Sequence, residues 1–340
     1  MIDQIAKLPR VSLGCFPTPL VDAKHLSQVL GGPRILIKRD DLSGLALGGN
    51  KCRMLEFLMG YVKQQGFDSY VISGVSNLSI QLASAAARLG IKVRQILLKD
   101  ATTPKEKQGN YVLHKVLNSD MRIREPTGRP AEILDDIIGQ RNSALESEVL
   151  KLRDEGYNPF VVRALESLPP VAGTGWVNGV DEIWQQLKEQ NIEPQYLVVT
   201  TGVGITHSAL VVGAKYLRTP FKIIGISNLY ERTKAISEVV RMSNETAEFL
   251  ELDISIMPEE IIIYDQYRGG YGTISKESIE AVKLVAQTEG FFLDPIYTGK
   301  AMAGLIDLIH KGQFTSKETI VFIHTGGIPS LFVHSEEFVS

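Results

Sequence analysis

A lysine stands at an unusual place in the stretch LGGNKCRMLEFL, which covers residues 47–58. Two glycines and an asparagine precede Lys51, and apolar residues at helical spacing follow it, so the lysine falls in the first turn of an expected helix. The positive end of a helix dipole is a poor place for a cation. This position therefore indicates that the amine is used, either to pair with a phosphate or to form a Schiff base.

Two further segments place polar groups at a strand-to-helix turn. The segment YLVVTTGVGITHSALVVGAKYL (196–217) is typical of a strand, a turn with Gly202 and Gly204, and a helix that begins near Thr206. The open N–H groups of such a turn suit a phosphate, but the spacing matches no nucleotide fingerprint, and taken alone the segment favours a plain tight turn that starts a helix. In VISGVSNLSIQLASAAARLG (71–90), Ser76 and Asn77 supply either a helix cap or a ligand-binding loop.

The elements that must position these residues alternate along almost the whole chain. Short apolar runs separated by amphipathic helical segments predict an α/β fold with doubly wound, mainly parallel sheets. A chain of 340 residues exceeds one typical core of about 100–200 residues, so we expect two domains. We place a smaller inserted α/β domain at 52–160 and a larger domain in 1–51 plus 161–340. The expected strands are RILIKRD, SYVISG, KVRQILL, PFVVRA, YLVVTTG, KIIGIS and ETIVFIHTGG.

Composition narrows the range of ligands. The net charge of -3 supplies no cationic surface for nucleic acid or an anionic membrane, and no apolar run is long enough to span a bilayer. Cys15 and Cys52 match no disulfide framework or zinc spacing, and no histidine pair has metal-ligand spacing. The charged N-terminus lacks the apolar core of a signal peptide. We expect a cytoplasmic protein without a metal, whose partner is a small molecule.

Four motifs in matching order resemble a known family. They are IKRDDLSGLALGGNKCRMLEFL (37–58), GGYG (269–272), EGFFLDPIYTGKAMAGLIDLI (289–309) and FIHTGGIPSLF (322–332). Over nearly the whole chain the sequence is similar to the pyridoxal-phosphate enzymes grouped with 1-aminocyclopropane-1-carboxylate deaminase and D-cysteine desulfhydrase. The resemblance implies a tryptophan synthase β-like, fold type II enzyme, a homodimer, with pyridoxal 5'-phosphate in the cleft between the two domains.

The resemblance also assigns roles to individual residues. By similarity, Lys51 would carry the cofactor as a Schiff base and then take the Cα proton of the substrate. Asn77 would hydrogen-bond the pyridoxal ring oxygen, and Ser76 would help to hold the substrate carboxylate near the reacting carbon. The turn that would hold the phosphate consists of Gly202, Val203, Gly204, Ile205 and Thr206.

Three positions near the end of the chain bear on the reaction type. Tyr271 and Tyr297 match the active-site tyrosines of the family and are candidate acid/base groups, although a packed tyrosine is the alternative for either. Thr298 would face the pyridine nitrogen, where the ring-opening deaminases have a glutamate. A neutral threonine favours elimination of a β-substituent, because that reaction needs a shorter-lived carbanion.

The expected function is thus a lyase that acts on a small amino acid by α,β-elimination, for example on D-cysteine to give pyruvate and ammonia. The alternatives are β-replacement or another step on an unusual amino acid, deamination of 1-aminocyclopropane-1-carboxylate, and an inactive relative that binds cofactor or amino acid. Departures from the family pattern at Val75, Leu78 and Ile80 predict a more apolar substrate pocket, and Met54 removes a potential phosphate partner.

Overall fold

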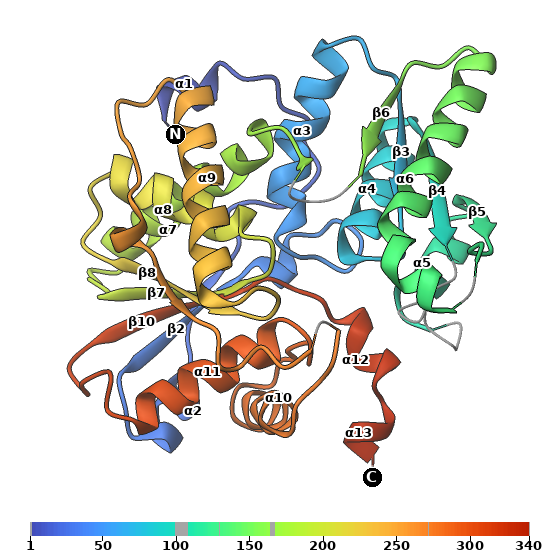
Figure 1. Cartoon of the computed structure of the whole chain (residues 1–340). Coiled ribbons are helices and arrows are strands. Elements are labelled where there is room, and N and C mark those ends of the chain that lie inside the picture. The colour runs from blue at the N-terminus through green and yellow to red at the C-terminus, as the bar shows by residue number, and fades with distance from the viewer. Residues whose placement is uncertain (1, 99–107, 129, 164–166, 271, 340) are drawn as a thin grey trace.

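The strands of the protein form two separate sheets in the computed structural model, which describes residues 2–98, 108–128, 130–163, 167–270 and 272–339 (Figure 1). The larger sheet has six strands in the order β1-β2-β10-β7-β8-β9, and its pairs are parallel except for β1 with β2. Its strands are β1 (Leu20–Asp22), β2 (Arg34–Arg39), β7 (Tyr196–Thr201), β8 (Lys222–Ser227), β9 (Ile262–Tyr264) and β10 (Thr319–His324).

The smaller sheet has four parallel strands in the order β5-β4-β3-β6. Its strands are β3 (Ser69–Ser73), β4 (Lys92–Leu98), β5 (Asp120–Arg124) and β6 (Pro159–Val162). The predicted α/β class with mainly parallel sheets is confirmed. Sequence reasoning missed β1, β5 and β9, because β1 and β9 have only three residues each and β5 is rich in charge. The domain division at residues 52 and 160 stays a prediction.

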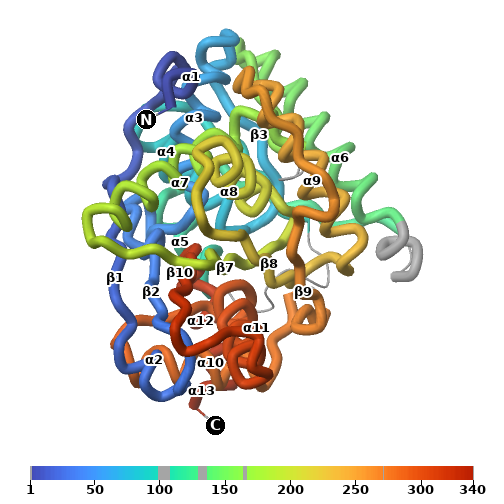
Figure 2. Tube along the Cα trace, turned by 90° about the vertical axis from the view of Figure 1, so that its left-hand side faces the viewer, coloured from blue at the N-terminus to red at the C-terminus, as the bar shows by residue number. Residues whose placement is uncertain are grey.

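Helices cover both faces of the larger sheet (Figures 1 and 2). One face carries α7 (Val171–Glu189), α8 (Ile205–Tyr216) and α9 (Arg232–Phe249), and the other carries α2 (Lys24–Leu30), α10 (Lys276–Glu289) and α11 (Thr298–His310). The remaining helices are α1 (Asp3–Ala6), α3 (Lys51–Gln64), α4 (Asn77–Leu89), α5 (Asn110–Val116), α6 (Pro130–Asp154), α12 (Pro329–Val333) and α13 (Glu336–Val339), with short 3-10 turns at Asp40–Leu42 and Pro258–Glu260.

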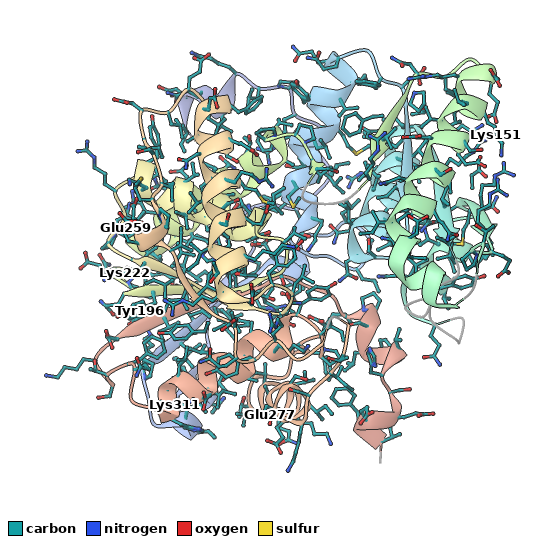
Figure 3. The ribbon with its side chains drawn as sticks, in the orientation of Figure 1. Lys151, Tyr196, Lys222, Glu259, Glu277 and Lys311 are labelled. Carbon is teal, nitrogen blue, oxygen red and sulfur yellow. The ribbon has the colours of Figure 1, made fainter. Side chains whose placement is uncertain are left out.

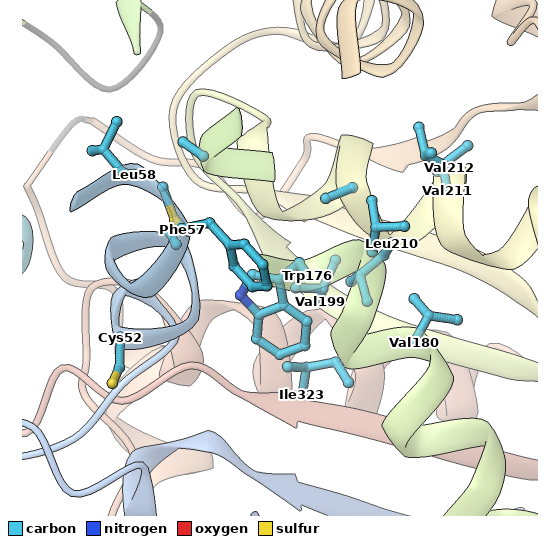
Figure 4. Packing of buried hydrophobic residues seen from close by; sticks show 14 of the residues in the cluster. Cys52, Phe57, Leu58, Trp176, Val180, Val199, Leu210, Val211, Val212 and Ile323 are labelled. Atoms are coloured by element: carbon cyan, nitrogen blue, oxygen red, sulfur yellow. The ribbon is translucent and has the colours of Figure 1, made fainter. Parts of the chain in front are cut away.

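Alternate residues of the central strands face two different hydrophobic cores, as the pleat of a strand requires. In β10, Val321 and Ile323 pack toward the cluster of α3, α7 and α8, whereas Ile320 and Phe322 pack toward the cluster of α2, α10 and α11. Figure 4 shows Trp176 within the first cluster, among Phe57, Val199 and Ile323. This core reaches the start of α3, because the indole Nε1 of Trp176 donates a hydrogen bond to the Asn50 carbonyl at 3.1 Å.

Charged side chains of both signs lie at the surface (Figure 3). Figure 3 shows Lys151, Lys222 and Lys311 at the periphery together with Glu259 and Glu277. Among the described residues, no helix is long and apolar enough to cross a membrane. The described part of the chain also contains no cluster of three or more histidine, cysteine or acidic side chains that would hold a metal ion.

Candidate active site

A cavity of about 130 Å³ lies where loops from both sheets meet. The start of α4 and the turn after β7 both contribute to its lining. The residues that line it are Asn50, Lys51, Ser76, Asn77, Leu78, Thr200, Thr201, Gly202, Val203, Gly204, Ile205, Thr206, His207, Asn228, Leu229, Tyr297 and Thr325. The structure therefore brings together every site residue expected from the sequence except Tyr271, which lies outside the described residues, and Thr298.

A tight glycine turn sets the position of Lys51. Gly48 has φ 75° and Gly49 has φ 127°, in the region that favours glycine. A Cβ atom at Gly48 would lie 1.6 Å from the Asp41 carbonyl oxygen, so no other residue fits there. The Asn50 N–H donates to the Thr325 carbonyl at 3.1 Å, and α3 begins at Lys51. The loop after β10 and the glycine turn together aim the lysine into the cavity.

The environment of Lys51 makes its amine reactive. Burial lowers the pKa of Lys51 to about 8, and the attraction of the Asp294 carboxylate only partly opposes this shift. The Nζ atom donates to Asn50 Oδ1 at 2.9 Å and lies 6.0 Å from the centre of the Tyr297 ring. About a tenth of the amine is therefore neutral at pH 7, far more than for an ordinary lysine, and a nucleophile or a base requires the neutral form.

The contact between Asn50 and Lys51 predicts a measurable pH dependence. In the unliganded protein, we expect the rate at which an amine-directed reagent modifies Lys51 to rise with pH through about 8. Asn50→Asp places a carboxylate where an oxygen now lies 2.9 Å from Nζ, which favours the charged amine and moves the midpoint to higher pH. Peptide mass spectrometry measures the rates, with the exposed Lys63 of α3 as internal reference. An unchanged midpoint would contradict the assigned contact.

The turn from Gly202 to Thr206 has the geometry of an anion site. Gly204 has φ 111° and precedes α8, whose first turn receives no hydrogen bond from a side-chain cap. The backbone N–H groups of the first turn of α8 therefore have no side-chain partner among the described residues, and they lie at the positive end of the helix dipole, among residues that line the cavity. The Thr206 hydroxyl accepts a hydrogen bond from Asn50 Nδ2 at 2.9 Å, so its own hydrogen is free to donate. These donors suit a phosphate.

Several buried polar atoms around this turn have no partner among the described residues. They are Thr200 Oγ1, His207 Nε2 and Asn228 Oδ1, all on residues that line the cavity. Because buried polar groups are nearly always hydrogen-bonded, these atoms indicate a polar occupant. Burial lowers the pKa of His207 to about 3, so the ring is neutral, and its Nδ1 lies 3.0 Å from Thr201 Oγ1. Lys51, the open helix start and these atoms fit pyridoxal phosphate.

The loop after β3 combines capping with exposure to the cavity. Ser76 caps α4, because its Oγ accepts from the Ser79 N–H at 3.2 Å, and its hydroxyl hydrogen remains available. Asn77 and Leu78 follow on the same wall. Ile80 is buried and does not line the cavity, so the expectation that it shapes the substrate pocket is wrong. Met54 is likewise buried in the core away from the cavity.

Thr298 lies behind the cavity wall. Its side chain is fully buried, and its Oγ1 donates to Asp294 Oδ1 at 2.7 Å. The Asp294 carboxylate also accepts from the N–H groups of Tyr297 and Thr298 at 2.8 Å, and so caps α11. Because that hydroxyl is occupied and Thr298 is not among the lining residues, the structure does not support direct contact between Thr298 and a ligand ring. Tyr297, at the same helix start, does line the cavity.

Sequence reasoning missed Asn50, Asn228, Asp294 and Thr325. Asn50 and Thr325 stand inside motifs that were recognised, and the Asp294 side chain caps the helix that begins at Thr298, so local signals existed for three of them. No local signal marks Asn228, which reaches the cavity only through the order of the strands. His207 lines the cavity, and His324 supports the neighbouring loop, because its Nε2 lies 2.9 Å from the Phe292 carbonyl oxygen.

Comparisons with known proteins agree with this geometry. Residues 11–326 match the family model described as pyridoxal-phosphate dependent enzyme. The chain is 36% identical to a D-cysteine desulfhydrase of Klebsiella pneumoniae (strain 342), over 98% of each chain. It is 33% identical to a putative 1-aminocyclopropane-1-carboxylate deaminase of Pyrococcus abyssi, over 98% of this chain and 96% of that one. A crystal structure described as an ACC deaminase homologue superposes with a TM-score of 0.83 at 32% identity, covering 100% of this chain and 99% of that one.

Proposed function

Because this chain belongs to the family of pyridoxal-phosphate dependent enzymes, we propose that it eliminates the β-substituent of a small β-substituted alanine such as D-cysteine, giving pyruvate and ammonia. The chain is a pyridoxal-phosphate-dependent lyase of the 1-aminocyclopropane-1-carboxylate deaminase and D-cysteine desulfhydrase type. The observation that carries the proposal is Lys51, whose pKa of about 8 and position between an anion-binding turn and the Ser76–Asn77 loop suit the reaction.

Residues from both sheets would hold the cofactor. The N–H groups at the start of α8 and the Thr206 hydroxyl would bind its phosphate, and Lys51 Nζ would bind it covalently. Asn77 would donate to its ring oxygen. When bound, pyridoxal phosphate supplies an electron sink for the negative charge that develops at the substrate Cα.

The chain's own groups would move the protons of the reaction. Lys51 Nζ, once free, would take the proton from the substrate Cα, because burial favours its neutral form. The hydroxyl of Ser76 or Tyr297 donates to the departing β-substituent, since both line the cavity beside Lys51. Tyr271 is a further proposed acid, from the sequence motif alone. Water then releases pyruvate and ammonia.

The described lining favours a substrate with a neutral side chain. Lys51 is the only lysine or arginine among the described lining residues, and none of them is acidic. A second carboxylate on the substrate would therefore lack a partner, which is costly in a desolvated site. The absence of an acidic side chain there also leaves a pyridine ring without an ion pair, which disfavours the longer-lived carbanion needed to open a cyclopropane ring.

Product analysis with a panel of amino acids tests the function. We expect β-chloroalanine and cysteine, in at least one enantiomer, to yield pyruvate and ammonia in equal amounts, and 1-aminocyclopropane-1-carboxylate to yield little or no 2-oxobutyrate. Trapping of a thiol or amine into a new amino acid would favour β-replacement instead. Ring opening without elimination from any β-substituted alanine would overturn the proposal, and no turnover of any amino acid would favour a binding protein.

The oligomeric state and the cellular location are proposed on the same basis. We propose a homodimer in the cytoplasm that binds no nucleic acid. Both cysteines are free thiols, which fits a reducing compartment, and the net charge is -3. Light scattering coupled to size exclusion measures the assembly: a mass near twice 37.5 kDa is expected, and a mass near 37.5 kDa would contradict it.

A further inference from the structure

Helix α5 presents two polar side chains to the first turn of α4. Asn110 and His114 lie one helical turn apart, on the same side of α5. Asn110 Nδ2 donates to Asn77 Oδ1 at 2.9 Å, and His114 Nε2 lies 3.1 Å from Ser79 Oγ. Of these four residues, only Asn77 lines the cavity. Helix α5 therefore contacts the first turn of α4 at Asn77 and at Ser79, from the side that does not line the cavity.

The bond from Asn110 determines which end of the Asn77 amide faces the cavity. A side-chain amide has an acceptor oxygen and a donor nitrogen. The Asn77 oxygen is taken by Asn110, whereas the Asn77 nitrogen has no hydrogen-bond partner among the described residues. With the oxygen held from behind, the nitrogen is the end that remains to serve a ligand. An acceptor on the ligand would be recognised, and a donor would not.

We propose that Asn110 is a positioning residue that acts through Asn77, holding its amide so that the nitrogen donates to the ring oxygen of the cofactor. This inference rests on the proposed role of Asn77. The ring oxygen is an acceptor when it is deprotonated, so it requires the donor end of the amide. Asn110 does not line the cavity and touches no reacting atom.

Contacts one helical turn beyond Asn110 tie α5 down at His114, whereas Asn110 Oδ1 is buried without a hydrogen-bond partner among the described residues. His114 is buried, and its Nδ1 lies 3.1 Å from Ser119 Oγ while its Nε2 lies 3.1 Å from Gln95 Nε2. Burial lowers the pKa of His114 to about 4, so its imidazole ring stays neutral above pH 5. Lys51 lines the same cavity as Asn77 and is the titratable group that the amide would influence through the cofactor.

Two substitutions remove the donor from Asn110 in different ways. Asn110→Asp is nearly isosteric but can only accept, so the Asn77 nitrogen would turn toward it and the oxygen would face the cofactor. Asn110→Leu removes the bond without adding charge. We expect either change to raise the apparent dissociation constant of pyridoxal phosphate about two- to tenfold, the effect of one lost hydrogen bond.

A spectroscopic readout separates positioning from a general structural role. A donor to the ring oxygen weakens that oxygen's hold on the proton of the nitrogen that joins cofactor and lysine. Its loss should therefore raise the pH midpoint of the cofactor absorption of the resting holoenzyme by about half to one unit. The thermal midpoint of the cofactor-free protein should change little, and Asn158→Asp, which removes an exposed amide bond to the Gly66 carbonyl, serves as the matched control.

A double-mutant cycle decides whether Asn110 acts through Asn77. In an Asn77→Ala background, we expect Asn110→Asp and Asn110→Leu to have no further effect on the dissociation constant or the absorption midpoint. A shift that persists there with either variant would show that Asn110 acts independently of Asn77 and overturn the proposal. If Asn77→Ala shifts both quantities but the Asn110 variants shift neither, the positioning role is wrong while the role of Asn77 stands. If Asn77→Ala shifts neither quantity, both roles are wrong.

Discussion

Replacing Lys51 by alanine is expected to abolish turnover and covalent attachment of the cofactor together. No other lysine lines the described part of the cavity, so no second amine can take over either the linkage or the proton transfer. A positioned acid/base group alone contributes about a hundred- to ten-thousandfold in rate, and Lys51 also carries the covalent step. We therefore expect the rate of pyruvate formation to fall by at least about a thousandfold.

The matched control for this experiment is Lys63→Ala. Lys63 lies on α3 with Lys51 but is exposed to solvent, so its loss should leave activity unchanged. Borohydride reduction followed by peptide mass spectrometry should find the cofactor on Lys51 in the parent and Lys63→Ala proteins, and on no cavity residue in Lys51→Ala. A reducible adduct in the cavity of the Lys51→Ala protein would contradict the assignment of Lys51.

Replacing Arg53 by methionine is expected to lower the free energy of unfolding by about 3–5 kcal/mol, the usual cost of removing one partner of a buried ion pair. The guanidinium of Arg53 is buried and donates to Asp40 Oδ2 at 2.7 Å and to Glu182 Oε1 at 2.7 Å. Without Arg53, Asp40 has no other basic partner within salt-bridge distance among the described residues. Urea denaturation measures the loss.

The same variant has a predictable pH dependence. Burial opposes the ionisation of Glu182, but hydrogen bonds and attraction from Arg53 and attraction from Lys38 lower its pKa to about 2. A carboxyl whose pKa is depressed by folding stabilises the protein above its unfolded pKa of about 4.3, and this contribution is lost as the pH falls toward about 2. The stability difference between the parent and Arg53→Met proteins should therefore narrow below about pH 4.3.

A surface ion pair provides the control for the Arg53 variant. Arg34 pairs with Asp22 at 2.7 Å, but its side chain is 47% exposed. Arg34→Met should cost less than about 1 kcal/mol, because solvent screens exposed pairs. A similar loss of unfolding free energy in Arg53→Met and Arg34→Met would contradict the larger contribution assigned to the buried network. The location of Arg53, two residues after Lys51, also makes this network the anchor that fixes the first turn of α3 against α7.

The local features of this protein can be read from its amino-acid sequence. The glycine turn before Lys51, the open helix start after Gly204 and the cap at Ser76 were all readable, because each depends on backbone preferences within a few residues. The continuous apolar strands likewise specified parallel sheets, since strands buried on both faces tolerate few polar residues. The matching order of four motifs then indicated the cofactor and the reaction class.

How these local features meet depends on contacts between segments that are distant in the sequence. The Asn110–Asn77 bond joins residues 33 positions apart and the Arg53–Glu182 pair joins residues 129 apart, so neither leaves a local trace in the sequence. The pKa of Lys51 depends on its burial, which is created by segments from both sheets. The motif places Thr298 beside the ligand ring, but only the structure shows that its hydroxyl donates to Asp294 Oδ1. Side-chain direction at a helix start is set by the partner that packing brings within hydrogen-bond distance, and sequence spacing does not contain that information.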